Sequence, residues 1–134
     1  MPPLLDTNVV LRHLLQDHPS HSARALALFR RISAGEVTAR LTSTVIIETV
    51  FTLERAYKRP REQIRMAIYE LLDEPNLLLA GKARWRRVLD LYVGYNLPLG
   101  DAEQVEMMQR LGITEIISFD TDFDRVPGIT RIEP

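Results

Sequence analysis

The chain opens with the stretch PLLDTNVV at residues 3–10, and this stretch decides the fold. A short apolar run ends at Asp6, the hydroxyl of Thr7 and the amide of Asn8 follow, and a second apolar segment begins at once. This order predicts a short buried strand that ends in a polar turn and leads into a helix. Asp6 then lies at the carboxyl end of a strand, where open α/β sheets bind their ligands.

Strand-like and helix-like segments alternate along the rest of the chain. Strands are expected at residues 36–41, 76–80, 115–119 and 129–132, and helices at about 8–15, 20–34, 44–56, 60–74, 82–95 and 101–111. Because parallel strands need helical crossovers, this alternation predicts a three-layer α/β/α sandwich around a central, mostly parallel sheet of about four or five strands. No internal repeat or linker interrupts the pattern, so residues 1–134 are expected to form a single domain.

The composition is that of an ordinary globular protein, with 46% hydrophobic and 26% charged residues. The chain has no cysteine, which excludes disulfides, thiolate catalysis and cysteine-rich zinc sites. No apolar stretch approaches the roughly 20 residues that span a bilayer, and the start lacks the features of a signal peptide. These features predict a cytoplasmic protein without a membrane partner.

The net charge of −1 does not by itself indicate a nucleic-acid partner. Basic residues nevertheless gather in two places, at residues 55–65 and 82–87. Two interpretations stay open: the groups lie on solvated helix faces, or they form a phosphate-binding rim around an acidic centre.

Four acidic residues are candidates for that centre: Asp6, Glu48, Asp101 and Asp120. Asp6 and Asp120 each follow an expected strand directly, and Asp101 lies near a helix start, where free N–H groups favour a carboxylate. Glu48 lies within an apolar helix, where its neighbours argue for burial and no basic residue offers a partner. Each has a simpler alternative: a helix cap for Asp6 and Asp101, a surface position for Glu48, and turn hydrogen bonding for Asp120 and Asp122.

Carboxylates that gather at one edge of a sheet repel one another. At an effective dielectric constant of ~20 and a separation of ~5 Å, each pair costs about 3 kcal/mol. A divalent cation removes this repulsion, and an all-oxygen site selects Mg²⁺ or Mn²⁺ over zinc. Such an ion presents water as a nucleophile and neutralises charge on a phosphate, so the predicted chemistry is phosphodiester hydrolysis.

The chain resembles the PIN domain family and, within it, the VapC-type toxins of type II toxin–antitoxin modules. The matching motifs are LLDTN at residues 4–8, Glu48 in its apolar helix, the pair Asp101-Ala102, and SFDTDFDRVPG at residues 118–128. The resemblance implies a PIN-like nuclease domain with the activity of an endoribonuclease that depends on Mg²⁺ or Mn²⁺. The four acids would be its catalytic residues and its metal ligands.

The resemblance also implies supporting residues and partners. Thr7, Asn8 and Asp122 would orient ligands or substrate. The partners would be an RNA substrate, a cognate antitoxin whose tail lies in the active-site groove, and a second copy of the chain in a homodimer. The sequence departs from the family just after the third acid, where Glu103 and Glu106 replace small and apolar residues. These two glutamates are expected to be solvated rather than to belong to the site.

Two other classes of function are compatible with parts of the pattern. A phosphatase of the haloacid-dehalogenase type also begins with a strand and an Asp. Its chemistry needs a second Asp two residues later, where this chain has Asn8, which cannot titrate. A non-catalytic domain that binds metal, RNA or protein is the other alternative, and metal-dependent RNA cleavage that is lost on Asp6→Asn would distinguish it. A DNA-binding regulator is disfavoured because the sequence has no paired-helix recognition motif.

Overall fold

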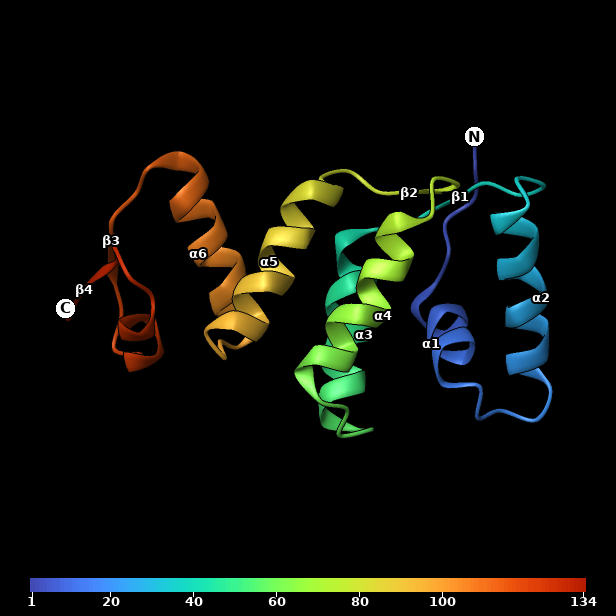
Figure 1. The fold of residues 1–134 in the computed structure, drawn as a ribbon, viewed down its shortest axis with the longest axis horizontal. Helices are drawn as coiled ribbons and strands as arrows, with labels where there is room; N and C mark the ends of the chain where they lie inside the picture. Colours follow the sequence, from blue (N-terminus) through green and yellow to red (C-terminus); the bar gives the residue numbers. More distant parts are fainter. The chain divides into compact units, whose positions relative to one another are not determined.

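The computed structural model describes the whole chain, residues 1–134. Six α-helices, one 3₁₀ helix and four short strands follow one another along it (Figure 1). Their bounds are α1 (Thr7–Leu15), α2 (His21–Ser33), β1 (Ala39–Arg40), α3 (Ser43–Arg55), α4 (Arg61–Asp73), β2 (Leu77–Leu78), α5 (Lys82–Gly94), α6 (Leu99–Leu111), β3 (Glu115–Ile117), η1 (Thr121–Arg125) and β4 (Thr130–Ile132). The chain divides into two compact units, residues 1–82 and 83–134, each of which is described by itself.

The strands of the first unit pair in parallel. Strands β1 and β2 lie side by side with Arg40 opposite Leu78. The opening stretch adds a third parallel segment, because Leu4 forms a bridge to Arg40, whose N–H donates to the carbonyl of Pro3 at 2.8 Å. The strand expected before Asp6 is therefore present, although only Leu5 is buried and Leu4 is 70% exposed.

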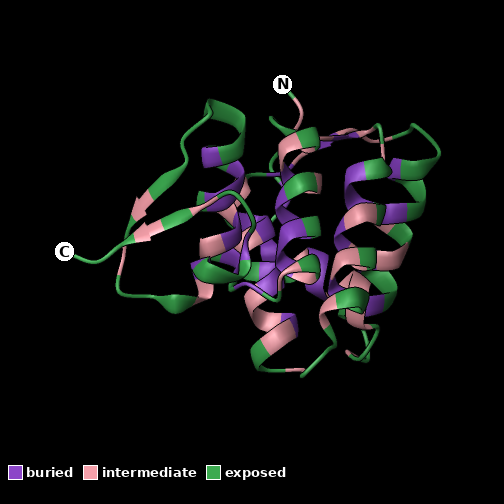
Figure 2. Cartoon of the chain, turned by 60° about the vertical axis from the view of Figure 1, so that its left-hand side comes forward, coloured by how far each residue is buried: buried purple, intermediate pink, exposed green.

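Helices of the first unit pack through apolar stripes. Helix α1 contacts α2 and α3, and α3 contacts α4. In α4 the residues Ile64, Ile68 and Leu72 recur one turn apart and are all buried, as expected for an amphipathic helix. Figure 2 shows buried residues along one side of the helices and exposed residues along the other. Gly35, the expected stop signal after α2, has a φ of +79°, which residues with a Cβ rarely adopt.

The second unit consists of α5, α6 and a parallel pair of strands. Strand β3 pairs with β4 so that Glu115 lies opposite Thr130 and Ile117 opposite Ile132. The connection between them contains η1 and spans about a dozen residues, the usual minimum for a parallel crossover. Helix α6 ends at Gly112, whose φ of 74° lets its N–H bond to a carbonyl of the last helical turn.

The α/β class, the six helices and the parallel pairing are confirmed. All five expected strands are found, one of them as the Leu4 bridge. They pair in two sheets, β1 with β2 and β3 with β4, whereas the sequence predicts one central sheet. The strands are only two or three residues long, so few backbone hydrogen bonds hold each ladder. None of the helices has the length and apolar character needed to cross a membrane.

Candidate functional site

Three carboxylates meet in the second unit. One oxygen from each of Asp101, Asp120 and Asp122 lies within 4.8 Å of the other two. Asp101 belongs to the first turn of α6, Asp120 is the N-cap of η1, and Asp122 lies within η1. We refer to these residues as the acidic triad. A set of three carboxylates without nitrogen or sulfur donors suits a hard divalent cation.

Local hydrogen bonds fix the turn that carries two members of the triad. The Asp120 carboxylate accepts a hydrogen bond from the Asp122 N–H at 2.9 Å, and the Ser118 hydroxyl accepts one from the Asp120 N–H at 2.9 Å. Asp120 therefore does structure its turn, as the simpler alternative proposes. This bond uses one carboxylate oxygen, and the same side chain also reaches the triad.

The pKa values within the triad move in opposite directions. Burial raises the pKa of Asp101 to about 6, helped by a hydrogen bond to Asp120 and by the negative charges of Asp120 and Asp122. The pKa of Asp120 is lowered, chiefly by the Asp122 N–H. A proton shared by this pair therefore resides on Asp101. The Oδ2 atom of Asp101 is buried and has no hydrogen-bond partner. A cation bound by the triad would relieve the repulsion from Asp120 and Asp122, which adds to the effect of burial on the pKa of Asp101.

Arg125 supports the triad and was not singled out in the sequence. Its guanidinium forms an ion pair with Asp122 at 2.8 Å and donates to the Asn96 carbonyl at 2.7 Å. The i,i+3 spacing of Asp122 and Arg125 within a helical turn was the available signal. The ion pair sets the position of Asp122, which the sequence suggests only as an orienting residue.

The first unit brings the remaining predicted residues together. The Thr7 hydroxyl donates to the Glu48 carboxylate at 2.6 Å, and the Asp6 carboxylate accepts from the Thr7 N–H at 2.8 Å. Asp6 is the N-cap of α1, as its simpler alternative proposes, and Asn8 is an exposed residue of the same first turn. The structure thus joins Asp6, Thr7 and Glu48 in a chain of two hydrogen bonds.

The expected burial of Glu48 is wrong. Its side chain is exposed, whereas Val45, Ile46 and Thr49 around it are buried. The helical turn of α3 directs these neighbours inward and Glu48 outward. The partner that the sequence did not reveal is a hydroxyl, Thr7, rather than a basic side chain.

The expectation that Glu103 and Glu106 are solvated is wrong for Glu106. Its side chain is only 1% exposed and lies 3.1 Å from both Arg87 of α5 and Arg110 of α6. Glu103 is partly exposed and lies 3.8 Å from Arg84. Neither glutamate is a member of the acidic triad.

Several residues of the two basic groups form ion pairs with acids on helices. The pairs are Arg61 with Glu54, Arg65 with Glu62, Arg84 with Glu103, and Arg87 with Glu106. A guanidinium already paired with a carboxylate is less free to bind phosphate. These contacts favour ion-paired helix faces over a phosphate-binding rim for the residues involved.

A family model described as PIN domain matches residues 4–129. The chain belongs to the PIN domain family. This PIN domain is also 27% identical over 131 residues to the VapC ribonuclease of Aquifex aeolicus (strain VF5), and the aligned region covers 98% of the chain and 96% of the relative. The matched residues include every acid of the triad and the pair Asp6 and Glu48.

Proposed function

We propose that this PIN domain is an endoribonuclease that depends on Mg²⁺ or Mn²⁺ and serves as the toxin of a toxin–antitoxin pair. The observation that carries the proposal is the acidic triad of Asp101, Asp120 and Asp122 in a chain that belongs to the PIN domain family. The similarity to a relative described as a VapC ribonuclease supports RNA as the substrate. Family membership also favours a nuclease over a phosphatase of the haloacid-dehalogenase type.

The residues of the triad fit a divalent metal ion. They offer only carboxylate oxygens, and the buried Oδ2 of Asp101 has no hydrogen-bond partner within the chain. When bound, the ion supplies an activated water and neutralises charge on the phosphate that is cleaved. Asp101 and Asp120 are the proposed metal ligands, with Asp122 as a third carboxylate held in place by Arg125.

The carboxyl groups of Asp101 and Asp120 differ in how readily they hold a proton. Asp101, with a pKa raised to about 6, holds a proton at lower pH and must release it before it can bind a cation. The Asp122 N–H keeps Asp120 ionised. The triad therefore takes up the metal more readily as the pH rises through the pKa of Asp101.

We assign catalytic and metal-binding roles to Asp6 and Glu48 as well, from their positions in the family motifs. The Thr7 hydroxyl supports this assignment, because its hydrogen bond at 2.6 Å holds the Glu48 carboxylate in one orientation. Asn8, exposed on the first turn of α1, is proposed to contact the substrate.

The proposal includes partners and a location. A toxin of this kind is inhibited by a cognate antitoxin protein and acts as a homodimer in the cytoplasm, where its RNA substrate is found. Residues 1–134 would act as a single nuclease domain. These statements are supported by the resemblance to VapC-type toxins and by the similarity to the VapC ribonuclease of Aquifex aeolicus.

RNA cleavage tests the proposed activity. Purified protein without its partner would be incubated with a mixture of structured RNAs in Mg²⁺, in Mn²⁺ and in EDTA. We expect cleavage in either metal, none in EDTA, and a loss of at least about 100-fold in the variant Asp120→Asn, because metal stabilisation of the transition state amounts to several kcal/mol. Asp124→Asn is the matched control, since Asp124 lies in the same 3₁₀ helix but pairs with Arg131 at 3.0 Å. Cleavage that persists in EDTA, or that is equal in the two variants, would contradict the proposal.

A further inference from the structure

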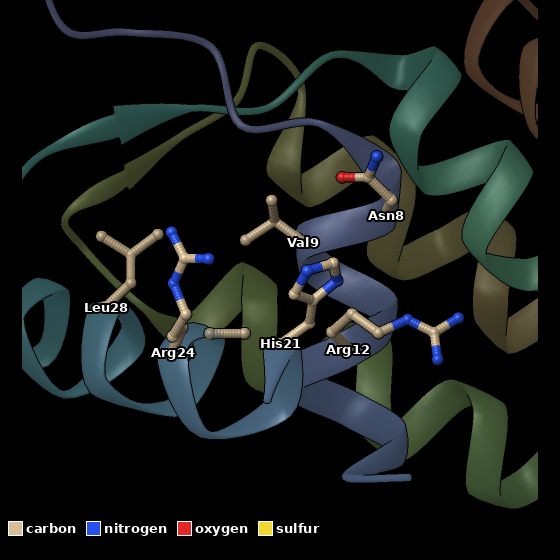
Figure 3. A pocket seen from close by; sticks show the side chains of 7 residues that line it. Asn8, Val9, Arg12, His21, Arg24 and Leu28 are labelled. Atoms are coloured by element: carbon tan, nitrogen blue, oxygen red, sulfur yellow. The ribbon is translucent and has the colours of Figure 1, made fainter. Parts of the chain in front are cut away.

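A pocket of ≈ 470 Å³ lies between α1 and α2 of the first unit. Its polar lining consists of Asn8, Arg12, His21 and Arg24, and its apolar lining includes Val9 and Leu28. Figure 3 shows His21 and Arg24 rising from α2 toward Val9 on α1, with Asn8 at the start of α1 and Leu28 beyond Arg24. The volume falls within the range of pockets that bind small ligands.

The two arginines and the histidine of this pocket differ in their contacts. Arg12 uses one guanidinium nitrogen in an ion pair with Asp17 at 2.9 Å. His21 stacks on His18 with ring centroids 4.1 Å apart and an interplanar angle of 11°, which holds its ring in place. The Arg24 side chain is exposed and has no ion pair or hydrogen bond to another residue. Arg24 is thus an unneutralised cation that lines a partly apolar pocket.

This combination matches the chemistry of a nucleotide. A guanidinium binds phosphate oxygens through paired N–H groups, so Arg24 is suited to a backbone phosphate. Bases of single-stranded RNA pack on apolar and aromatic surfaces, including imidazole rings, and are read by amide groups such as that of Asn8. A purely apolar ligand would leave Arg24 and His21 without partners, and a free anion would not use the wall of Val9 and Leu28.

The position of the pocket connects it to the candidate acids of the same unit. Asn8 is two residues beyond Asp6, and the residue between them, Thr7, holds the Glu48 carboxylate. The pocket therefore begins on the helical turn that Asp6 caps. We propose that this pocket is a nucleotide subsite of the RNA substrate, in which Arg24 binds a backbone phosphate and the surface around His21 and Val9 receives a base. The inference rests on the proposed ribonuclease function and identifies where one nucleotide of the RNA substrate is held.

RNA binding without cleavage tests this subsite. The probe is a short, fluorescently labelled single-stranded RNA of randomised sequence, titrated with full-length protein in EDTA. Arg24→Ala is compared with Arg30→Ala, which removes an exposed arginine from the same helix but from outside this pocket. Alanine is a good helix former, so both variants should fold. We expect Arg24→Ala to weaken binding about 10-fold and to reduce the slope of log K against log salt by about one, as for a lost phosphate contact. Arg30→Ala should change neither quantity.

The outcomes separate the subsite from the ribonuclease proposal. Equal RNA affinities for Arg24→Ala and Arg30→Ala would overturn the subsite, even if the wild type cuts RNA in Mn²⁺. A protein partner would then be the favoured occupant of the pocket. A loss of RNA affinity in Arg24→Ala but not in Arg30→Ala supports the subsite. If that loss is seen while the wild type cuts no RNA in any metal, the nuclease proposal fails and the RNA-binding pocket stands. A shift of the His21 ring signals in NMR spectra when the RNA is added gives a second readout, and unchanged signals would contradict the proposal.

Discussion

Replacing Asp101 by Asn should stabilise the metal-free protein. The substitution removes the negative charge of a carboxyl group whose pKa is raised from the usual 3.8 to about 6 by burial and by two neighbouring carboxylates. Its Oδ2 atom has no hydrogen-bond donor to compensate for that burial. Asparagine keeps the shape of the side chain and adds N–H donors that can reach Asp120 or Asp122. The repulsion that the metal would relieve is thereby relieved without metal.

The size of the effect follows from the pKa of Asp101. A rise of this extent corresponds to about 3 kcal/mol, but water screens a side chain that is only partly buried, so about 1 kcal/mol is the expected gain. The sign depends on pH. Because the pKa of Asp101 is higher in the folded state than in the unfolded state, this carboxyl lowers the stability of the wild type only when it is ionised. The penalty is absent below about pH 4, grows as the pH rises toward 6 and is constant above that.

Urea unfolding in EDTA measures this stability. At pH 7.5 the midpoint of Asp101→Asn should lie above that of the wild type, and the difference should vanish near pH 4. Asp124→Asn, the control from the same turn region, should be slightly less stable than the wild type because it loses the ion pair with Arg131. In millimolar Mn²⁺ the order of Asp101→Asn and wild type should reverse, since a ligand that binds only the folded state stabilises it. Asp101→Asn that is no more stable than the wild type at pH 7.5 in EDTA would refute the electrostatic reasoning.

Three further substitutions test other parts of the structure. Glu106→Gln removes the charge of a buried carboxylate held by two arginines, and should lower the free energy of unfolding by about 2 kcal/mol; a change near zero in urea unfolding would contradict this. Thr7→Val removes the hydroxyl that orients the Glu48 carboxylate and should reduce RNA cleavage about 10-fold, whereas Thr7→Ser should keep the wild-type rate; equal rates for the two variants would contradict this role of the hydroxyl. Burial lowers the pKa of His13, which stacks on Phe29 with centroids 3.8 Å apart, against a smaller opposing effect of a nearby glutamate. The unfolded chain therefore binds this proton more readily, so stability should fall as the pH drops from about 7 to 5, and His13→Phe should flatten that fall. An unchanged pH profile in the variant would mean that His13 does not cause it.

Local patterns in the sequence were sufficient to predict the elements and part of the triad. The apolar run that ends at Asp6 and the run before Asp120 both form the expected extended segments, and Gly112 ends its helix as expected. Such features depend on backbone preferences of neighbouring residues. Membership of Asp122 in the triad was only partly predictable, because it depends on the turn that Asp120 caps and on the ion pair with Arg125.

Contacts between distant segments could not be predicted in the same way. The bond between Thr7 and Glu48 joins residues 41 apart, and requires α1 to pack on α3. Glu106 is buried and pairs with Arg87 of another helix, a contact that only the packing of α5 and α6 reveals, whereas its pairing with Arg110 four residues later had a local signal. The proposed nucleotide pocket is lined by residues of both α1 and α2, so the sequence around Arg24 alone could not predict it. In each case the missing information is which helix faces which.

Binding of Mn²⁺ to the metal-free protein tests the central claim most directly. Isothermal titration calorimetry at pH 7.5 would compare the wild type, Asp120→Asn and Asp124→Asn. If the acidic triad holds the metal, the wild type and Asp124→Asn bind Mn²⁺ with similar affinity, and Asp120→Asn binds it at least about 10-fold more weakly. Folded wild-type protein that binds no Mn²⁺, or three proteins that bind it equally well, would contradict the assignment of the metal site to Asp101, Asp120 and Asp122.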